Sequence, residues 1–348
     1  SPVTGVRPGT VLKPEEQKSY ELGTEWRFLN NRVGVEFTYY ANETKNQYLT
    51  IPAPTNANGF QNYAYNGGVI SNKGIELVLY GKVIDSDKFT WNSTINYSFN
   101  KNKVTNLPKD QGGVVIITPD SNNNYRYALT EGQPFGTIQG WKPIRNDKGQ
   151  LVLDDKGAIQ KYKDSNGNNW VDIGNSNPDF MIGFSNNFKY GNYNLNFTID
   201  GRFGGKILSM TQAVMDINGV SKASGDARNA GGVKIDAVMP DGTLVTTMDA
   251  NKYYSSIGGR NGLSSEYMYD ATNVSLREIS LGYTFNLGEN KLLKSASVSF
   301  VGRNLFFIYK DAPFDPNISL STGNGLQGVD VFGMPSTRSV GLNLNVTF

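Results

Sequence analysis

The feature that most constrains this chain is a two-residue alternation between residues 89 and 103, FTWNSTINYSFNKNK. Apolar side chains occupy one parity, broken only by Ser93, and they are Phe89, Trp91, Ile95, Tyr97 and Phe99. The other parity carries uncharged polar side chains, Thr90, Asn92, Thr94, Asn96, Ser98 and Asn100. Successive side chains of a β-strand point to opposite faces, so this pattern predicts a strand with one apolar and one polar face.

Eight further stretches alternate in the same way, which predicts an all-β chain with nine antiparallel strands. They lie at 18–29, 32–49, 69–84, 179–190, 193–203, 273–287, 295–309 and 337–348. Gly191 and Asn192 separate two of these stretches. A Gly-Asn pair between alternating runs is a strong hairpin signal, because such turns need positive φ.

The connections between these strands alternate in length. Connections at 30–31, 85–88 and 191–192 are short and that at 288–294 is moderate, whereas those at 50–68, 104–178, 204–272 and 310–336 are long. Several strands exceed the ~5–6 residues usual in soluble sheets and reach the ~9–11 residues needed to cross a bilayer. This asymmetry is typical of bacterial outer-membrane barrels, whose short turns face the periplasm and whose long loops face outside.

In such a barrel we expect the apolar parity of 89–99 to face lipid, with Trp91, Ile95, Tyr97 and Phe99 among the lipid-facing residues. Thr90, Asn92, Thr94, Asn96 and Ser98 are then expected to line a hydrated lumen. The alternative is a soluble β-sandwich binding module whose polar face meets bulk water. Against that alternative, the polar parity is rich in Asn, Thr and Ser, whereas solvent-facing strands commonly carry charged residues such as Lys.

Composition removes several classes of function. The chain has no Cys and no His, which excludes disulfides, thiol catalysis, Ser-His-Asp catalysis and His-ligated zinc. Its net charge of +2 gives no electrostatic reason to propose a nucleic-acid partner. Its aliphatic runs are too short for a transmembrane helix, so any membrane role must come from strands.

Nine strands in an open sheet leave two edge strands unpaired, which is not viable in hydrocarbon. We therefore expect this polypeptide to be part of a larger barrel. If its last strand ends at the periplasmic side, its first strand descends from the outside.

Several blocks of the chain resemble, in order, the SusC/RagA family of TonB-dependent outer-membrane transporters of Bacteroidetes. They include LKPEEQKSYELGTEWRFLNNRVGVEFTYYANETKNQYL, ISNKGIELVLYGKVIDSDKFTWNSTINYSFNKNKVTNL, GNSNPDFMIGFSNNFKYGNYNLNFTIDGRFGG and GRNLFFIYKDAPFDPNISLSTGNGLQGVDVFGMPSTRSVGLNLNVTF. The resemblance covers nearly the whole chain.

The resemblance implies a barrel of 22 strands in the outer membrane, plugged by an N-terminal domain that follows a TonB box. It also implies a SusD-like lipoprotein lid, glycan or peptide cargo, and energy from TonB and the proton-motive force. Residues 1–348 are then expected to form the last nine strands, without plug or TonB box. Phe348 resembles the terminal aromatic residue that the barrel-insertion machinery reads.

The segment DSNGNNWVD at 164–172 is a candidate cation loop. Asp164, Asn166, Asn168 and Asp172 present oxygens at alternate positions, as calcium loops do. The position of the EF-hand glycine holds Asn169, and that of the closing glutamate holds Asn175. The sequence thus leaves two interpretations open, a bound Ca²⁺ or an Asx-rich turn.

Four aromatic residues of the long connections, Trp141, Trp170, Tyr253 and Tyr254, are candidates to contact cargo or the lid. Aromatic faces stack on sugars, pack on peptides and are enriched at interfaces. The alternative is ordinary packing of loop against loop.

We expect no enzymatic activity: acids such as Asp154, Asp155 and Asp164 could serve a two-carboxylate glycosidase, but nothing places a pair across a cleft. An adhesin or structural barrel is the other alternative, which TonB-dependent uptake would exclude.

Overall fold

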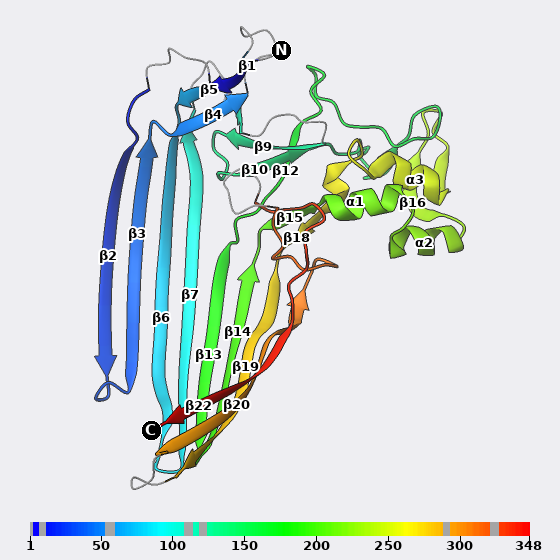
Figure 1. Cartoon of the computed structure of the whole chain (residues 1–348). Coiled ribbons are helices and arrows are strands. Elements are labelled where there is room, and N and C mark those ends of the chain that lie inside the picture. The colour runs from blue at the N-terminus through cyan, green and yellow to red at the C-terminus, as the bar shows by residue number, and fades with distance from the viewer. Residues whose placement is uncertain are drawn as a thin grey trace.

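A computed structural model describes residues 3–6, 12–52, 60–107, 114–117, 124–287, 293–320 and 327–348. Within them, nine long strands form one antiparallel sheet, the curved wall in Figure 1. In sheet order they are β2 (Glu16–Phe28), β3 (Val33–Lys45), β6 (Val69–Asp85), β7 (Phe89–Asn106), β13 (Phe180–Tyr190), β14 (Tyr193–Phe203), β19 (Asn273–Asn286), β20 (Ser295–Lys310) and β22 (Ser339–Thr347). The nine predicted strands are confirmed, each to within a few residues.

The short connections gather at the lower end of the sheet in Figure 1. Gly191, at a φ of 55°, and Asn192 join β13 to β14, with Tyr190 paired directly to Tyr193. The first turn is wider than Asn30 and Asn31 alone, because Leu29 also adopts a left-handed φ of 53°. The connection predicted at 288–294 lies mostly outside the described residues.

Two glycines let neighbouring strands approach closely under a tyrosine ring. A Cβ on Gly74 of β6 would lie 2.2 Å from Cζ of Tyr40 on β3. A Cβ on Gly34 of β3 would lie 2.1 Å from Cζ of Tyr80 on β6. Only glycine at these two positions allows each tyrosine ring to lie flat across the adjacent strand.

The long connections fold into a second region, which we call the loop layer and which comprises the described residues of 46–68, 107–178, 204–272 and 311–338. Its strands are β4 (Tyr48–Pro52), β5 (Phe60–Asn66), β8 (Val114–Ile116), β9 (Tyr125–Thr130), β10 (Thr137–Gly140), β11 (Leu151–Val152), β12 (Val171–Asn175), β15 (Lys206–Ser209), β16 (Val233–Val238), β17 (Leu244–Met248), β18 (Met268–Asp270) and β21 (Val329–Asp330), and β1 (Val3–Val6) pairs with β5. These short strands form four small sheets at the upper end of the wall (Figure 1).

The loop layer also contains three helices that the sequence analysis did not predict, α1 (Met210–Ile217), α2 (Lys222–Asn229) and α3 (Ala250–Ile257). Each begins after a side chain that accepts a backbone N–H of its first turn, namely Ser209, Ser221 and Asp249. These N-caps are the signal that could have revealed them. Among the described residues, no helix is long and apolar enough to cross a membrane.

The buried apolar core lies in the loop layer. Its largest cluster joins β9, β10, β15, α1 and α3 through side chains such as Tyr127, Ile138, Leu208, Met210 and Ile257. Of the described buried apolar residues, only Ile70 and Val104 belong to the long strands, and both sit at their loop end. The remaining apolar side chains of the wall lie on its surface.

Both edge strands of the wall lack a neighbour among the described residues. The sheet runs in linear order from β2 to β22 without closing. Every residue of β2 is exposed, and so is every residue of β22 except Val346. The two edges therefore present free backbone donors and acceptors, as expected for an incomplete barrel.

Candidate functional site

The polar face of the wall carries a ladder of amide side chains across four strands. Asn92 of β7 lies opposite Asn187 of β13 and donates to its Oδ1 at 3.5 Å. Asn187 in turn donates to Asn196 of β14, whose Nδ2 donates to Ser280 Oγ of β19 at 3.0 Å. Cross-strand partners of Thr90, Thr94, Asn96 and Ser98 extend the same face. The five residues predicted to line a lumen thus share one face, and of the five Asn92 belongs to the hydrogen-bonded ladder.

A second amide row connects this polar face to the loop layer. Asn102 Nδ2 donates to Asn72 Oδ1 at 2.7 Å, and Asn72 Nδ2 donates to Asn42 Oδ1 at 3.0 Å. Asn102 Oδ1 accepts the backbone N–H of Phe135, a loop-layer residue, at 2.7 Å. The loop layer is therefore attached to the wall through its polar face.

The opposite face of the wall is lined by stacked aromatic rings. Trp91 stacks on Phe188 with ring centroids 5.4 Å apart, and Phe188 stacks on Phe197 at 5.9 Å. Nearer the loop end, Tyr97 packs on Phe180 at 5.8 Å. Trp91, Ile95, Tyr97 and Phe99, together with Phe89, all belong to this apolar face.

One polar residue on the apolar face was missed by the sequence analysis. Asn186 is 4% exposed, and its Oδ1 accepts the indole N–H of Trp91 at 2.9 Å. It faces Ser93, the residue that breaks the apolar run of β7. Ser93, which interrupts the alternation, thus lies opposite the buried asparagine that accepts the hydrogen bond of Trp91.

A cavity of about 560 Å³ lies where the polar face meets the loop layer. Its lining is rich in amides and includes Asn100, Asn102, Asn175 and Asn177. Asn175 and Asn177 both donate through Nδ2 to the carbonyl of Phe135, at 3.0 and 3.2 Å. The sequence analysis did not predict that these amides meet, because only the packing of the loop layer against the wall brings them together.

An ion pair also borders this cavity, with Lys206 Nζ 3.0 Å from Asp270 Oδ2. Partial burial opposes ionisation of Asp270, but hydrogen bonds from Thr272 and Lys206 outweigh it and lower the pKa of this carboxyl. Asp270 is thus held in its charged form beside the cavity between the polar face and the loop layer.

Trp141 and Trp170, predicted as cargo or lid contacts, lie against each other with ring centroids 5.6 Å apart. The Arg126 guanidinium lies 4.4 Å from the centroid of Trp170, and Lys161 Nζ lies 4.3 Å from that of Trp141. The two rings are tilted by 50° to each other, and each has one cation over its face. Burial lowers the pKa of Lys161. Both rings are partly exposed at the surface of the loop layer.

Tyr253 and Tyr254 form a second aromatic pair on α3, edge to face at 5.2 Å. Both pack against the main loop-layer core and are partly buried. Burial raises the pKa of Tyr253 to about 12 and also raises that of Tyr254. These two rings are therefore part of the packing of the loop layer, with limited surface left for a partner.

The candidate cation loop is the third of three consecutive turns of one kind, which begin at Asn146, Asp154 and Asp164. In each, the side-chain Oδ1 accepts backbone N–H groups from the residues two and four positions later, at 2.8 to 3.0 Å. In each, a glycine three positions later has positive φ, at 82°, 69° and 79°. Because Asn146 forms this turn without a charge, the same turn at Asp164 can form without a cation.

The other candidate ligands of this loop have partners as well. Asn168 Oδ1 accepts the backbone N–H of Trp170 at 3.2 Å, and Asp172 Oδ1 accepts from Gln139 Nε2 at 2.9 Å. Within the described part of the chain, no three or more acidic side chains gather as a metal site would require. Ca²⁺ binding at 164–172, with Asn166 as a fourth ligand, stays a prediction.

Phe348 ends the chain directly after β22 and is 71% exposed. The C-terminus lies at the lower end of the wall in Figure 1. Its role in barrel insertion stays a prediction.

Long strands, one continuous apolar face, one polar face and two edges without a neighbour in the described part of the chain define it as part of a transmembrane antiparallel β-barrel. Residues 1–206 match the family described as TonB dependent receptor-like, beta-barrel. The chain belongs to this family, whose members are outer-membrane proteins.

Curated relatives agree with this assignment over nearly the whole chain. TonB-dependent receptor P3 of Formosa agariphila is 26% identical over 97% of this chain and 34% of its own length. TonB-dependent receptor SusC of Bacteroides thetaiotaomicron is 22% identical over 97% of this chain and 32% of its own length. The chain spans about a third of the length of these relatives, all of which are named receptors.

Solved structures share the fold. The structure titled as the RagAB peptide importer in the open-open state matches 97% of this chain and 35% of its own chain, with a TM-score of 0.70 at 17% identity. The RagAB peptide transporter matches 96% of this chain and 35% of its own, with a TM-score of 0.68 at 18% identity.

Proposed function

We propose that residues 1–348 form the C-terminal segment of the barrel of an outer-membrane importer that takes up glycans or peptides by a TonB-dependent mechanism. The two edges of the wall, which have no partner among the residues that the structure describes, carry this proposal, because only further strands of a larger barrel can satisfy them within lipid. The coverage of relatives supports it, since a chain that spans about a third of a receptor leaves ample length for the plug, the TonB box and the other strands.

The apolar face has the height that a membrane requires. Phe99 lies ten residue steps after Phe89, or ~34 Å along a strand at ~3.4 Å per residue. At a strand tilt of ~40°, this corresponds to ~26 Å along the membrane normal, close to the ~25 Å apolar band of outer-membrane barrels. Aromatic rings lie at both ends of this interval, where such barrels carry aromatic girdles.

The polar face and the loop layer are then the transport surfaces. The amide ladder from Asn92 to Ser280 lines the lumen, where it contacts the plug and passing cargo. The loop layer lies on the extracellular side and meets a SusD-like surface lipoprotein that closes over the barrel. Relatives named SusC and RagAB support an assembly of this kind, and glycans and peptides are the two cargo classes that we propose.

Uptake in the bacterium that carries the complete transporter tests this function. We expect uptake of its labelled oligosaccharide or peptide cargo to be lost when tonB is deleted, and a SusD-like lipoprotein to co-purify with the transporter. An adhesin or structural barrel would instead retain its function without TonB. Uptake that persists in the tonB deletion strain would contradict the proposal.

The loop aromatics are tested in the same complete transporter. Trp141→Ala with Trp170→Ala should weaken binding of cargo or of the lipoprotein at least fivefold, because it removes the partly exposed rings that form the contact. Tyr190→Ala, which removes an exposed ring at the opposite end of the wall, is the matched control. Unchanged affinities for both ligands would remove the two tryptophans from the contact surface.

A further inference from the structure

The pairing of β19 with β20 is interrupted at a pair of β-bulges near the loop end of the wall. Leu276 pairs with Phe306 and Glu278 pairs with Arg303, so that Arg277 alone opposes two residues of β20. One of these two, Asn304, has a left-handed φ of 51°. Bulges re-aim side chains and occur next to binding sites, and strained non-glycine residues concentrate at functional positions.

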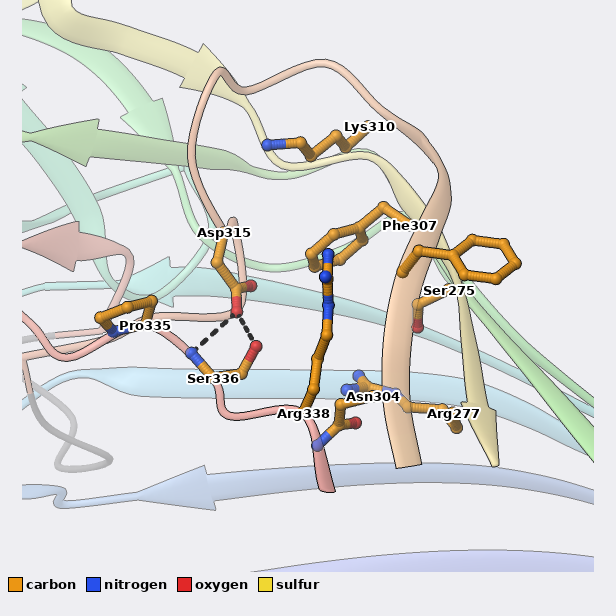
Figure 2. Close-up of a pocket in the computed structure, with 10 residues that line it drawn as sticks. Ser275, Arg277, Asn304, Phe307, Lys310, Asp315, Pro335, Ser336 and Arg338 are labelled. Atoms are coloured by element: carbon orange, nitrogen blue, oxygen red, sulfur yellow. Dashed lines mark hydrogen bonds between the residues drawn. The ribbon is translucent and has the colours of Figure 1, made fainter. Parts of the chain in front are cut away.

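A cavity of about 410 Å³ opens at this bulge (Figure 2). Three cations line it: Arg277 from β19, Lys310 from the end of β20 and Arg338 immediately before β22. Ser275 and Phe307 also line this cavity. Ser275 is paired with both Asp200 and Phe307, which places the cavity on the polar face of the wall.

The charges of this pocket do not cancel. Its one acidic side chain, Asp315, accepts hydrogen bonds through Oδ2 from the backbone N–H of Ser336 at 3.4 Å and from Ser336 Oγ at 2.5 Å. These are the dashed lines in Figure 2. Among the described residues, no ion pair joins Asp315 to any of the three cations.

Two of the three cations are already oriented by neighbours. Arg277 Nε lies 2.9 Å from Asp200 Oδ2, which engages one edge of the guanidinium. Lys310 Nζ donates to the carbonyl of Phe314 at 3.1 Å, which leaves two of its three N–H donors for other acceptors. Asp200 does not line the pocket, so its charge offsets Arg277 from outside.

An unpaired buried hydroxyl supplies a second, independent indication of a ligand. Ser275 is 4% exposed, and its Oγ has no hydrogen-bond partner among the described residues. A buried polar group without a partner destabilises the folded state. An oxygen-bearing ligand in the pocket would remove that cost by accepting from, or donating to, this hydroxyl.

We propose that this pocket binds a carboxylate carried by the cargo. Arg338 and Lys310 supply the opposing charges, Arg277 adds its remaining N–H donors, and the Ser275 hydroxyl completes the hydrogen bonds. The Phe307 ring lies beside the non-ionised body of the bound group. The proposal rests on the importer function, because it assigns to the polar face a preference for acidic cargo.

Equilibrium binding to the complete, detergent-solubilised transporter tests the pocket by isothermal titration calorimetry. Two matched pairs of probes separate the possible sources of the carboxylate: cellobiouronate with cellobiose, and the dipeptide Ala-Phe with its C-terminal amide. We expect the acidic member of at least one pair to bind at least tenfold more tightly than its neutral partner. The pair that shows the difference identifies the carboxylate as that of a sugar acid or of a peptide.

Variants connect this preference to the pocket. Arg338→Gln and Lys310→Gln should each reduce it to less than threefold, and Ser275→Ala should weaken acidic-probe binding two- to fivefold. Arg338→Lys should restore most of the Arg338→Gln loss. Lys189 lies on the polar face at the short-turn end of the wall, opposite Thr90 and far from the pocket. Lys189→Gln therefore removes one positive charge and should leave the preference intact. Barrel mobility in unheated gel electrophoresis verifies that each variant is folded.

Equal binding of acidic and neutral probes by the wild type would overturn the proposal, and so would an undiminished preference in both charge variants. The first outcome is expected if acidic groups of the missing barrel segment already fill the pocket. Because binding is measured without TonB, uptake that proves independent of TonB would contradict the importer function while leaving the carboxylate pocket standing.

Discussion

The wall and the loop layer use apolar side chains in opposite ways. In the loop layer, side chains such as Leu208 and Ile138 are completely buried against neighbours from several short elements. In the wall, Leu281 is 56% exposed, and Phe300 and Leu342 lie beside it on the same outward face. The two regions belong to one chain and share strands, yet only the loop layer has the interior of a water-soluble protein.

The difference follows from the solvent that each region meets. The loop layer must remove its apolar surface from water, so it gathers that surface into a core. The wall can leave its apolar face outside, because acyl chains cover it, and it must instead pair every backbone group between strands. Its polar side chains turn to the opposite face and hydrogen-bond to one another. Mutations should therefore have different consequences in the two regions.

The largest effect is expected from a cavity in the loop-layer core. Leu208→Ala removes a side chain that is 0% exposed and should destabilise the loop layer by ~2–5 kcal/mol. Leu281→Ala, on the apolar face of the wall, should cost much less because lipid can fill the space. Hydrogen exchange of the complete transporter, read at β15 and β19, measures both. Equal costs would show that the wall also depends on a packed interior.

A charge on the wall distinguishes its two faces. Ile95→Arg on the apolar face should destabilise the folded barrel by ~2–4 kcal/mol near the bilayer midplane, whereas Thr94→Arg on the polar face should have little effect. Folding titrations of the complete barrel into lipid vesicles give both values. If Thr94→Arg is the more harmful, the assignment of the faces must be reversed.

A smaller effect is expected at the turn of the candidate cation loop. Asp164→Ala removes two side-chain hydrogen bonds to the backbone, each worth ~0.5–1.5 kcal/mol. Asp164→Asn keeps the Oδ1 oxygen that accepts both of them, as Asn146 does in its own turn. Protection of residues 164–170 from proteolysis should therefore fall for the alanine variant alone. Ca²⁺ titration of both variants decides the cation. A Ca²⁺-dependent gain in protection that Asp164→Asn abolishes would establish the metal site.

The smallest effect at neutral pH, and a clear one in alkali, is expected for Tyr253. Its folded-state pKa is raised to about 12 from an ordinary value of 10.0, mainly by burial. Between these values the unfolded state loses its phenolic proton while the folded state keeps it, so the loop layer loses stability as pH rises from 10 to 12. Tyr253→Phe should lessen that loss in unfolding measured at pH 8, 10 and 12. An identical pH profile in the variant would contradict the assignment.

The sequence alone predicted the wall almost completely. Alternation is a local property: Trp91 and Asn92 must face opposite ways in any strand, whatever surrounds them. Turn residues such as Gly191 and Asn192 set the register of their hairpin for the same reason. Connection lengths then fixed which end of the wall carries the loops. The break in alternation at Ser93 was visible too, although its contact with Asn186 was not.

The loop layer was predicted far less well. Its short strands carry no long period, and its three helices of eight residues each are too brief to show a clear amphipathic pattern. Trp141 and Trp170 were recognised as loop aromatics, but the cations stacked on them come from other segments of the chain. The repeated turn that begins at Asn146, Asp154 and Asp164 has the same pattern in the sequence each time, an Asn or Asp followed three residues later by a glycine, and the sequence analysis predicted a turn at the third position alone.

The amino-acid order by itself determined that this chain is a run of two-faced strands with long loops at one end, because a period of two needs no distant partner to be read. Only the tertiary structure decided which side chains meet. Ser275, Lys310 and Arg338 converge at one cavity because a bulge in β19 and β20 redirects the chain there. Contacts of this kind depend on which strands and loops pack together in three dimensions, and a local sequence pattern carries no information about that packing.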